Sequence, residues 1–265
     1  MDFKFKDKYN IFDLLEIMKI LRSEDGCPWD RVQTHKSIRQ NFIEETYEAV
    51  EAIDTDDSEL LKEELGDVLM QVIFHTLMEE EQERFNFDDV CNDVCNKLII
   101  RHPHVFSDVT ADTPETVLKN WDKIKMQTKK QELISDTLDS VAKSLPSLMR
   151  AQKIQKRSAK SGMDFKNVND ASEKILEEYN ELMSAISEND KDKQAQELGD
   201  LLFSVVNVSR FLDIDSEQAL YAANDKFSDR FRKLENLAAK RNIDLKTASD
   251  TLINSLWEEV KYSDN

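Results

Sequence analysis

The sequence holds two groups of five acidic residues with the same internal spacing, offset by 133 positions. The first group is Glu44, Glu45, Glu48, Glu64 and Asp67, and the second is Glu177, Glu178, Glu181, Glu197 and Asp200. On an α-helix, residues three or four apart lie on one face, so each group would bring several carboxylates together. Because like charges repel, such a cluster needs a cation or a proton between its members.

The ligand types indicate which cation would suit these clusters. Carboxylate oxygens without thiolate or imidazole favour hard Mg²⁺, with Mn²⁺ as a substitute, over zinc. Iron sites in helical bundles use Glu-x-x-His, and the second half of the chain contains no histidine. Because Mg²⁺ commonly takes further ligands from substrate phosphates, the acids predict a phosphate ester or anhydride as substrate. Lys226 and Arg230, one helical turn apart, are suited to hold the outer phosphates.

The rest of the chain predicts an all-α fold that would position these acids. Only 4 Gly and 4 Pro occur in 265 residues, and apolar residues recur three and four apart rather than in alternation. The duplicated acids predict two homologous four-helix units, residues 1–107 and 145–265. A charged connector, residues 108–144, joins them and contains Trp121 and a helical stretch of its own.

Local signals predict where helices start and how two of them pack. Asp170, Asp215 and Thr113 are candidate N-caps, the last followed by a proline at the first helical position. In the second unit, apolar stripes run beside the acids, and we expect them to form the buried seam of a hairpin with the acids at its edge. The stripes are Ile175, Tyr179, Leu182 and Ile186 on the first helix and Leu198, Leu201, Leu202 and Val205 on the second.

Charge and composition exclude several classes of protein. The net charge of −18 opposes general nucleic-acid or anionic-membrane binding, because phosphate backbones attract Lys and Arg. No apolar run approaches the length that a membrane span requires. The 3 cysteines lack zinc-like spacing, and the N-terminus does not read as a signal peptide, so we expect a cytoplasmic protein.

Several motifs together resemble a known family. The pattern Glu-Glu-x-x-Glu followed by Glu-x-x-Asp resembles the signature of the all-α nucleoside triphosphate pyrophosphohydrolases. Within that superfamily the chain is similar to the two-domain MazG family in three further segments. These are Gly26-Cys27-Pro28-Trp29-Asp30, Arg101-His102-Pro103-His104-Val105-Phe106, and Ala151-Gln152-Lys153-Ile154-Gln155-Lys156.

The resemblance implies an activity and a set of roles. It implies Mg²⁺-dependent hydrolysis of nucleoside triphosphates, ATP-like substrates included, to the monophosphate and pyrophosphate by a homodimer that clears unwanted nucleotides or tunes stress signalling. It implies an attacking water between carboxylate-held Mg²⁺ ions and the α-phosphorus. We expect metal ligation by Glu178, Glu181, Glu197 and Asp200. We expect Glu177 to orient or deprotonate the water, and substrate contacts from Lys193, Asn207, Lys226, Arg230 and Trp257.

The first unit keeps the same kind of acids, so it is a possible second metal site. Its candidate residues are Glu45, Glu48, Glu64 and Asp67, with Lys97 and Arg101 as the basic pair. Phe74 stands where the second unit has Asn207, and an apolar ring there would reshape the nucleoside end of the pocket. The resemblance favours the second unit for catalysis.

Two alternative functions remain at the level of sequence. The acids alone are also compatible with an acidic helical interaction protein, antitoxin-like and without enzymatic activity. A metal-dependent phosphohydrolase that removes the terminal phosphate would use similar residues. Product identification separates all three, since an interaction protein releases no product and terminal cleavage yields a diphosphate.

Overall fold

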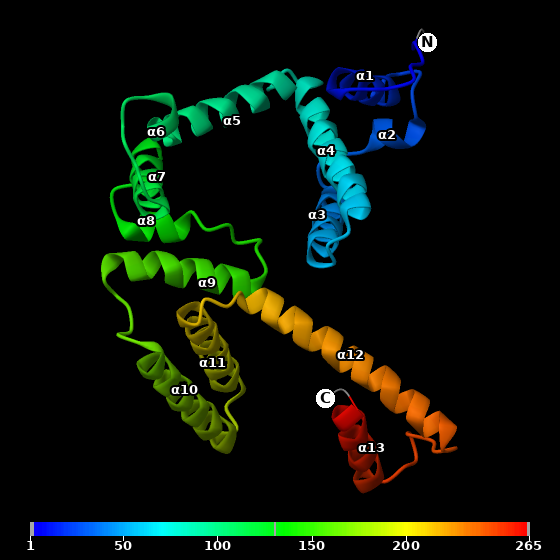
Figure 1. Ribbon diagram of the computed structural model, residues 1–265, viewed down its shortest axis with the longest axis vertical. Coiled ribbons are helices and arrows are strands. Elements are labelled where there is room, and N and C mark those ends of the chain that lie inside the picture. Colours follow the sequence, from blue (N-terminus) through cyan, green and yellow to red (C-terminus); the bar gives the residue numbers. More distant parts are fainter. Residues whose placement is uncertain (1–2, 130, 264–265) are drawn as a thin grey trace. The chain divides into compact units, whose positions relative to one another are not determined.

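The structure is a computed structural model that describes residues 3–129 and 131–263, and every regular element in those ranges is helical (Figure 1). The expected all-α fold is therefore confirmed. In chain order the elements are α1 (Ile11–Arg22), α2 (Pro28–Val32), α3 (Arg39–Asp54), α4 (Ser58–Glu80), α5 (Phe87–Arg101), α6 (Pro103–Phe106), α7 (Pro114–Thr128), α8 (Ile134–Asp139), α9 (Ser147–Ser158), the 3₁₀ turn η1 (Ala159–Ser161), α10 (Val168–Glu188), α11 (Lys191–Phe211), α12 (Ser216–Lys240) and α13 (Asp250–Ser263).

The chain divides into two compact units, residues 1–125 and 126–265. This division falls inside the region that the sequence assigns to a connector. The helical stretch expected around Trp121 is present as α7, which ends at Thr128. Two helical units agree with the duplication that the acidic residues indicate.

In the first unit, α3 and α4 pack as a hairpin, and α1 packs on the C-terminal part of α4. Met18 from α1, Ile38 before α3, and Ile73 from α4 form the centre of the apolar core, together with Phe74, Leu77 and Met78. Arg22 lies over the Phe74 ring, 5.1 Å from its centroid. Helix α5 then leads away from the hairpin in Figure 1.

The second unit repeats this plan around a second helical hairpin. Helices α10 and α11 form an extensively packed hairpin, α9 packs across α11, and α12 leads away to pair with α13 (Figure 1). The α12–α13 pair has its own core of Leu234, Ala238, Leu256 and Val260. The acids and the Lys226–Arg230 pair therefore lie on two different helical hairpins.

Two of the three expected helix caps are confirmed. Asp215 accepts hydrogen bonds from the backbone N–H groups of Glu217 and Gln218 at 2.9 and 3.1 Å. The Thr113 hydroxyl caps α7, which begins with a proline. The expectation for Asp170 was wrong: Asn167 caps α10 and Asp170 stands at its third position.

The packing of α10 against α11 differs from the expected apolar seam. Ala171, Ala185 and Val206 are buried between elements, whereas Tyr179 and Leu202 are 50% and 51% exposed. The hairpin therefore buries small side chains, and much of the predicted stripes stays exposed. The exposed apolar side chains of the hairpin are Leu176, Tyr179, Met183, Ile186, Leu198, Leu202, Phe203 and Val205.

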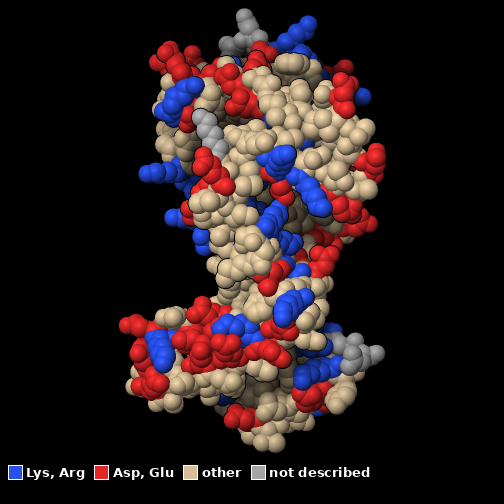
Figure 2. All heavy atoms as spheres, turned by 90° about the vertical axis from the view of Figure 1, so that its left-hand side faces the viewer, with Lys and Arg blue, Asp and Glu red and all other residues tan. Residues whose placement is uncertain are grey.

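The surface agrees with the acidic composition. On the face drawn in Figure 2, Asp and Glu gather in patches, and Lys and Arg lie scattered among them, so the residues coloured there form no broad basic surface. Within the described ranges, no helix is both long and apolar enough to cross a membrane.

Candidate functional site

The second unit brings acids from α10 and α11 into one cluster. Glu178, Glu197 and Asp200 each place a carboxylate oxygen within 4.8 Å of the other two. Glu178 is only 5% exposed and Glu197 only 8%, while Asp200 is open to solvent. The acids therefore do not sit at the edge of an apolar seam, as the sequence suggested. Two of them are buried within the hairpin.

The closeness of these carboxylates changes the pKa values of the groups around them. Burial, followed by the charges of Glu178 and Glu197, raises the pKa of the Glu181 carboxyl above its usual value. Lys174, one turn before Glu178, partly offsets the negative charge. Its Nζ lies 2.6 Å from Glu178 Oε1 and 2.7 Å from Glu177 Oε1, and these contacts raise the pKa of Lys174. The sequence analysis did not single out Lys174, although its i, i+4 spacing to Glu178 was a signal.

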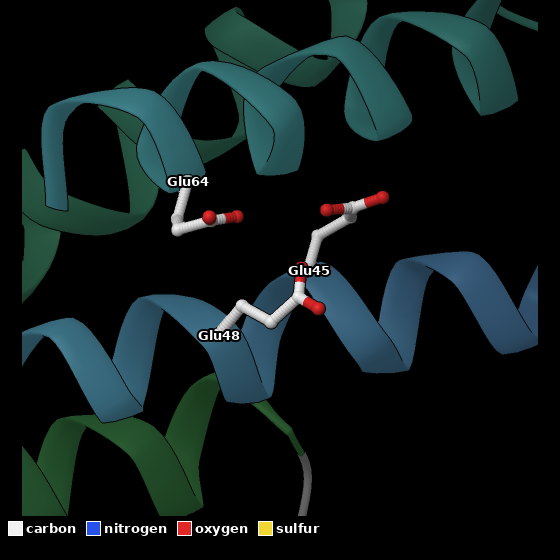
Figure 3. A group of neighbouring side chains, drawn as sticks. All are labelled: Glu45, Glu48 and Glu64. Atoms are coloured by element: carbon white, nitrogen blue, oxygen red, sulfur yellow. The ribbon is translucent and has the colours of Figure 1, made fainter. Parts of the chain in front are cut away.

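A second cluster lies between α3 and α4 of the first unit. Figure 3 shows the carboxylates of Glu45 and Glu48 on α3 and of Glu64 on α4 facing the space between the two helices. One oxygen from each lies within 4.8 Å of the others. Burial and the neighbouring carboxylates, including that of Asp67, raise the pKa values of Glu45 and Glu64.

The two clusters use different members of the repeated acids. Glu45 and Glu64 correspond to Glu178 and Glu197, but the third member is Glu48 in the first unit and Asp200 in the second. The predicted ligands thus gather in both units, with Glu181 and Asp67 close enough to shift neighbouring carboxyl pKa values or to be shifted by them.

The predicted basic and aromatic residues of the second unit lie apart from its acids in the same chain. Lys226 and Arg230 are on α12, which diverges from the α10–α11 hairpin in Figure 1. Trp257, on α13, has its ring centroid 5.4 Å from that of Phe227 on α12. Lys193, in the first turn of α11, pairs with Glu188, with Nζ and Oε2 3.0 Å apart.

The basic pair of the first unit shows a similar separation. Lys97 and Arg101 are on α5, the helix that leads away from the acidic α3–α4 hairpin (Figure 1). The Arg101 guanidinium lies over the Trp121 ring, 5.3 Å from its centroid. Arg101 therefore contacts α7, the helix that follows.

A cavity of about 370 Å³ adjoins α11 beyond the acids. Asn207, which the sequence assigned to nucleoside contact, lines it. The sequence analysis gave no role to Gln155, Asp164 or Arg210, which also line it. These residues connect α9 and the loop before α10 with α11. Such contacts between distant segments cannot be predicted from residue spacing along the chain. The other lining residues are Leu138, Ile154, Ser158, Met163, Phe165 and Phe203.

The donor set fits a hard divalent cation. Both clusters consist of carboxylates alone, and in the described part of the chain the ammonium group that pairs with Glu178 is that of Lys174, one turn earlier on the same helix. Partly buried carboxylates whose pKa values are raised by one another are stabilised by a metal ion that satisfies their oxygens. Oxygen-only donors suit Mg²⁺ or Mn²⁺.

Comparison with known proteins gives the relatives of this chain. The MazG nucleotide pyrophosphohydrolase domain matches residues 33–106 and 167–234, one match in each unit. A nucleoside triphosphate pyrophosphohydrolase of Escherichia coli K12 is 42% identical over 94% of this chain and 95% of its own length. The nucleoside triphosphate pyrophosphohydrolase/pyrophosphatase MazG of Thermotoga maritima is 42% identical over 95% of this chain and 96% of its own.

The matched segments contain the structural features described above. Residues 33–106 include both acidic helices of the first unit, and residues 167–234 include α10, α11 and the Lys226–Arg230 pair. The repeated acids, the two helical units and this full-length similarity lead to one conclusion. The chain belongs to the MazG family of nucleotide pyrophosphohydrolases.

Proposed function

We propose that the chain hydrolyses nucleoside triphosphates to the monophosphate and pyrophosphate with Mg²⁺, chiefly in its second unit. The observation that carries the proposal is the cluster of Glu178, Glu197 and Asp200, in which both glutamates are buried. A solvated acidic face, as in an interaction protein, has no need to bury two carboxylates side by side, because burial without a counter-ion costs free energy. Family membership supports the same chemistry.

The chain would act mainly by positioning charged groups. Glu178, Glu181, Glu197 and Asp200 would hold Mg²⁺, which when bound lowers the pKa of water and neutralises phosphate charge. Glu177 is exposed beside the cluster and would orient the attacking water and accept its proton. Water adds to the α-phosphorus as the bond to the bridging oxygen breaks, so pyrophosphate leaves and the nucleoside keeps one phosphate. Lys193, Lys226 and Arg230 would bind the departing phosphates.

We propose catalysis chiefly in the second unit because of the residue that follows the acids on the second helix of each hairpin. Asn207 lines a cavity in the second unit. Its counterpart Phe74 is 4% exposed and belongs to the apolar core of the first unit. A nucleoside would therefore find an open cavity that Asn207 lines in the second unit. In the first, it would meet packed side chains.

We also propose a homodimer in which each site combines two chains. The acids and the basic pair lie on separate hairpins of one chain, so a second copy would supply Lys226, Arg230 and Trp257. The apolar side chains exposed on α10 and α11 support this arrangement, since a stable homodimer interface is rich in apolar contacts. Leu220, Tyr221, Phe227 and Phe231 of α12 are also exposed and would face such a surface.

The proposed setting is the cytoplasm, and the proposed role is removal of unwanted nucleotides or control of stress nucleotides. Both follow from the family resemblance and from a substrate that is made and used inside cells.

Product analysis tests the proposed reaction. With Mg²⁺ and a nucleoside triphosphate, we expect monophosphate and pyrophosphate in equal amounts. Glu178→Gln should lower turnover by at least about 100-fold, because the Mg²⁺ that stabilises the transition state would lose an anionic ligand. Glu48→Gln measures the contribution of the first unit, and Glu173→Gln, exposed on the same helix as Glu178, is the matched control.

Three results would contradict the proposal. Diphosphate and orthophosphate as products would assign terminal cleavage instead. No product with any triphosphate would favour a binding protein. Near wild-type activity of Glu178→Gln, with Glu48→Gln inactive, would move catalysis to the first unit.

A further inference from the structure

Gln152 on α9 joins that helix to the turn between α11 and α12. Its Nε2 donates to the backbone carbonyl of Ile214 at 2.9 Å. Its Oε1 accepts from the backbone N–H of Ser216 at 3.3 Å and from the Ser216 hydroxyl at 3.1 Å. Both side chains are buried. Because the Ile214 carbonyl can only accept and the Ser216 N–H can only donate, the Gln152 amide has a single orientation here.

Helices α9 and α12 also exchange capping hydrogen bonds at this corner of the second unit. The N–H groups in the first turn of a helix have no partner inside that helix. Ser216 is the first residue of α12, and Gln152 on α9 accepts from its N–H. Met149, the third residue of α9, donates its N–H to Glu217 Oε2 on α12 at 3.2 Å. Each helix thus satisfies a donor of the other, which fixes the start of α12 on α9.

The first turn of α12 is where this helix is held against the part of the unit that carries the acids. Among the 25 residues of α12, all of which the structure describes, only Ser216, Leu234 and Ala238 are buried. Leu234 and Ala238 belong to the core that α12 shares with α13. Beyond its start, α12 runs away from α9 and α11 (Figure 1). The direction of α12 relative to the acidic hairpin therefore depends on the hydrogen bonds at its first turn.

The direction of α12 determines where its basic pair lies. Lys226 and Arg230 follow Ser216 by ten and fourteen residues, which is about 15 and 21 Å along a helix. At the farther position, a tilt of about 10° at the start of the helix displaces a residue by roughly 4 Å. A displacement of about 1 Å can already slow a reaction about 100-fold. A small change at the Gln152 corner is thus large at the basic pair.

We propose that Gln152 is a positioning residue for the reaction: it sets the direction of α12 and so places Lys226 and Arg230 against the outer phosphates of the substrate. It acts through those two residues and not through the acids of α10 and α11. This inference rests on the proposed function, which gives Lys226 and Arg230 their role. It holds whether the acids that face them belong to the same chain or to a second copy.

Binding of separate parts of the substrate tests this role. Gln152→Met keeps the side-chain length and removes the hydrogen bonds at the corner, while α9 stays bonded to α11 through Gln155 and the Phe203 carbonyl. We expect the Kd for inorganic pyrophosphate, measured by calorimetry with Mg²⁺ present, to rise at least about tenfold, because charge-assisted hydrogen bonds to phosphate are lost. The affinities for Mg²⁺ alone and for a nucleoside monophosphate should stay unchanged. Gln218→Met, at an exposed position in the first turn of α12, is the matched control and should behave as wild type.

A second variant gives a conservative rescue. In Gln152→Glu, an ionised carboxylate still accepts from Ser216 but cannot donate to the Ile214 carbonyl, so pyrophosphate binding should weaken. Burial raises the pKa of a carboxyl group, so lowering the pH from about 8 to about 6 should protonate it and restore the donor. The pyrophosphate affinity of Gln152→Glu, relative to wild type at the same pH, should then recover, whereas that of Gln152→Met should not. Thermal unfolding of each variant checks that it folds.

A double variant shows whether Gln152 acts through Arg230. In Arg230→Ala, the guanidinium group that α12 positions is absent. Adding Gln152→Met to Arg230→Ala should therefore weaken pyrophosphate binding less than Gln152→Met does alone, because residues that act together are not additive. In kinetics, kcat/KM of Gln152→Met for a nucleoside triphosphate should fall at least about tenfold.

The outcomes separate this inference from the proposed function. If Gln152→Met binds pyrophosphate as wild type does, if its loss adds fully to that of Arg230→Ala, or if wild type binds no pyrophosphate, the positioning role is wrong. Equal losses of Mg²⁺ and monophosphate binding would show that Gln152 only supports the fold, which also overturns it. If wild type releases no pyrophosphate from a triphosphate, the proposed function fails, and the binding results still decide the role of Gln152.

Discussion

Burying acids of the two clusters beside one another costs free energy. Glu64, Glu178 and Glu197 are each less than 9% exposed, although Glu is among the residues that proteins most rarely bury. Each lies beside further carboxylates, so desolvation and repulsion act in the same direction. A chain that keeps such groups at neutral pH gains stability from whatever cation neutralises them.

This leads to a prediction about magnesium and pH. The pKa values of Glu45, Glu64 and Glu181 are raised in the folded state, so the folded state binds more protons than the unfolded state. The stabilisation that these groups contribute is therefore complete below their unfolded pKa and is lost as pH rises through the folded values. Mg²⁺ offers these carboxylates a positive charge in place of a proton, so at pH 7.5 added Mg²⁺ should stabilise the protein.

Thermal unfolding with and without a chelator measures this effect. At a hundred times the dissociation constant, a ligand adds about 2.7 kcal/mol, which corresponds to roughly 5–10 °C in Tm for a unit of this size. The increment should shrink as pH falls toward the ordinary glutamate pKa, because protons then compete with the metal. An equal increment in the double variant Glu48→Gln, Glu178→Gln would contradict metal binding at the clusters.

Residue spacing predicted the acids well, because i, i+3 and i, i+4 relations depend only on the helix itself. Asn207 lines a cavity, and its expected contact with the nucleoside stays a prediction. The hydrogen bond from Gln155 to the Phe203 carbonyl could not be predicted, since it depends on how α9 packs on α11. The position of Lys226 and Arg230 relative to the acids could not be predicted from the sequence either, because it depends on the direction in which α12 leaves α11.

Among the elements, helix boundaries were predicted where a single cap was available and missed where two competed. Asp215 is a cap because it directly precedes its helix. Before α10, both Asn167 and Asp170 have suitable side chains, and Asn167, the earlier one, adds three residues to the helix. The packing of α10 on α11 was missed for another reason. Small Ala171 and Ala185 were not weighed against the large apolar residues beside them.

The surroundings of three glycines predict how their replacement by alanine changes the stability of the fold. A Cβ at Gly26 would overlap the carbonyl oxygens of Ile20 and Leu21 at the end of α1, whereas no atom lies within 4 Å of one at Gly66 or Gly199. We therefore expect Gly26→Ala to destabilise the fold by about 1–3 kcal/mol. Gly66→Ala and Gly199→Ala, inside α4 and α11, should each stabilise it by up to about 1 kcal/mol.

Denaturant unfolding of the three variants measures the differences directly. Gly66→Ala and Gly199→Ala are controls for Gly26→Ala, since they make the same chemical change where space is open. Loss of stability in Gly66→Ala or Gly199→Ala would show that something outside the described chain, such as a second copy, packs closely on that helix.

For the whole molecule, the central question is whether acids and basic residues of one site come from one chain or two. Mixing two inactive variants answers it. Glu178→Gln lacks the acid of its own hairpin, and Arg230→Ala lacks the basic residue on α12. If sites form between chains, a mixed dimer contains one intact site and one doubly altered site.

We therefore expect co-expressed Glu178→Gln and Arg230→Ala chains to recover activity, up to about a quarter of wild type for random pairing of two chains. Each variant alone should remain almost inactive, and pyrophosphate release measures all three samples. A mixture no more active than the average of its components would place each site within a single chain.

The presence of two related units could be predicted from the sequence, because all five acids recur at the same offset along the chain. The unequal burial of the two clusters could not. Glu178 and Glu197 are both buried in the second unit, whereas only Glu64 is buried in the first. Attraction between opposite charges strengthens as water is excluded, so we expect the two hairpins to bind Mg²⁺ with unequal strength. Ion uptake by one chain should then follow two successive saturation steps, and a cell whose free magnesium lies between them would fill one hairpin and leave the other bare.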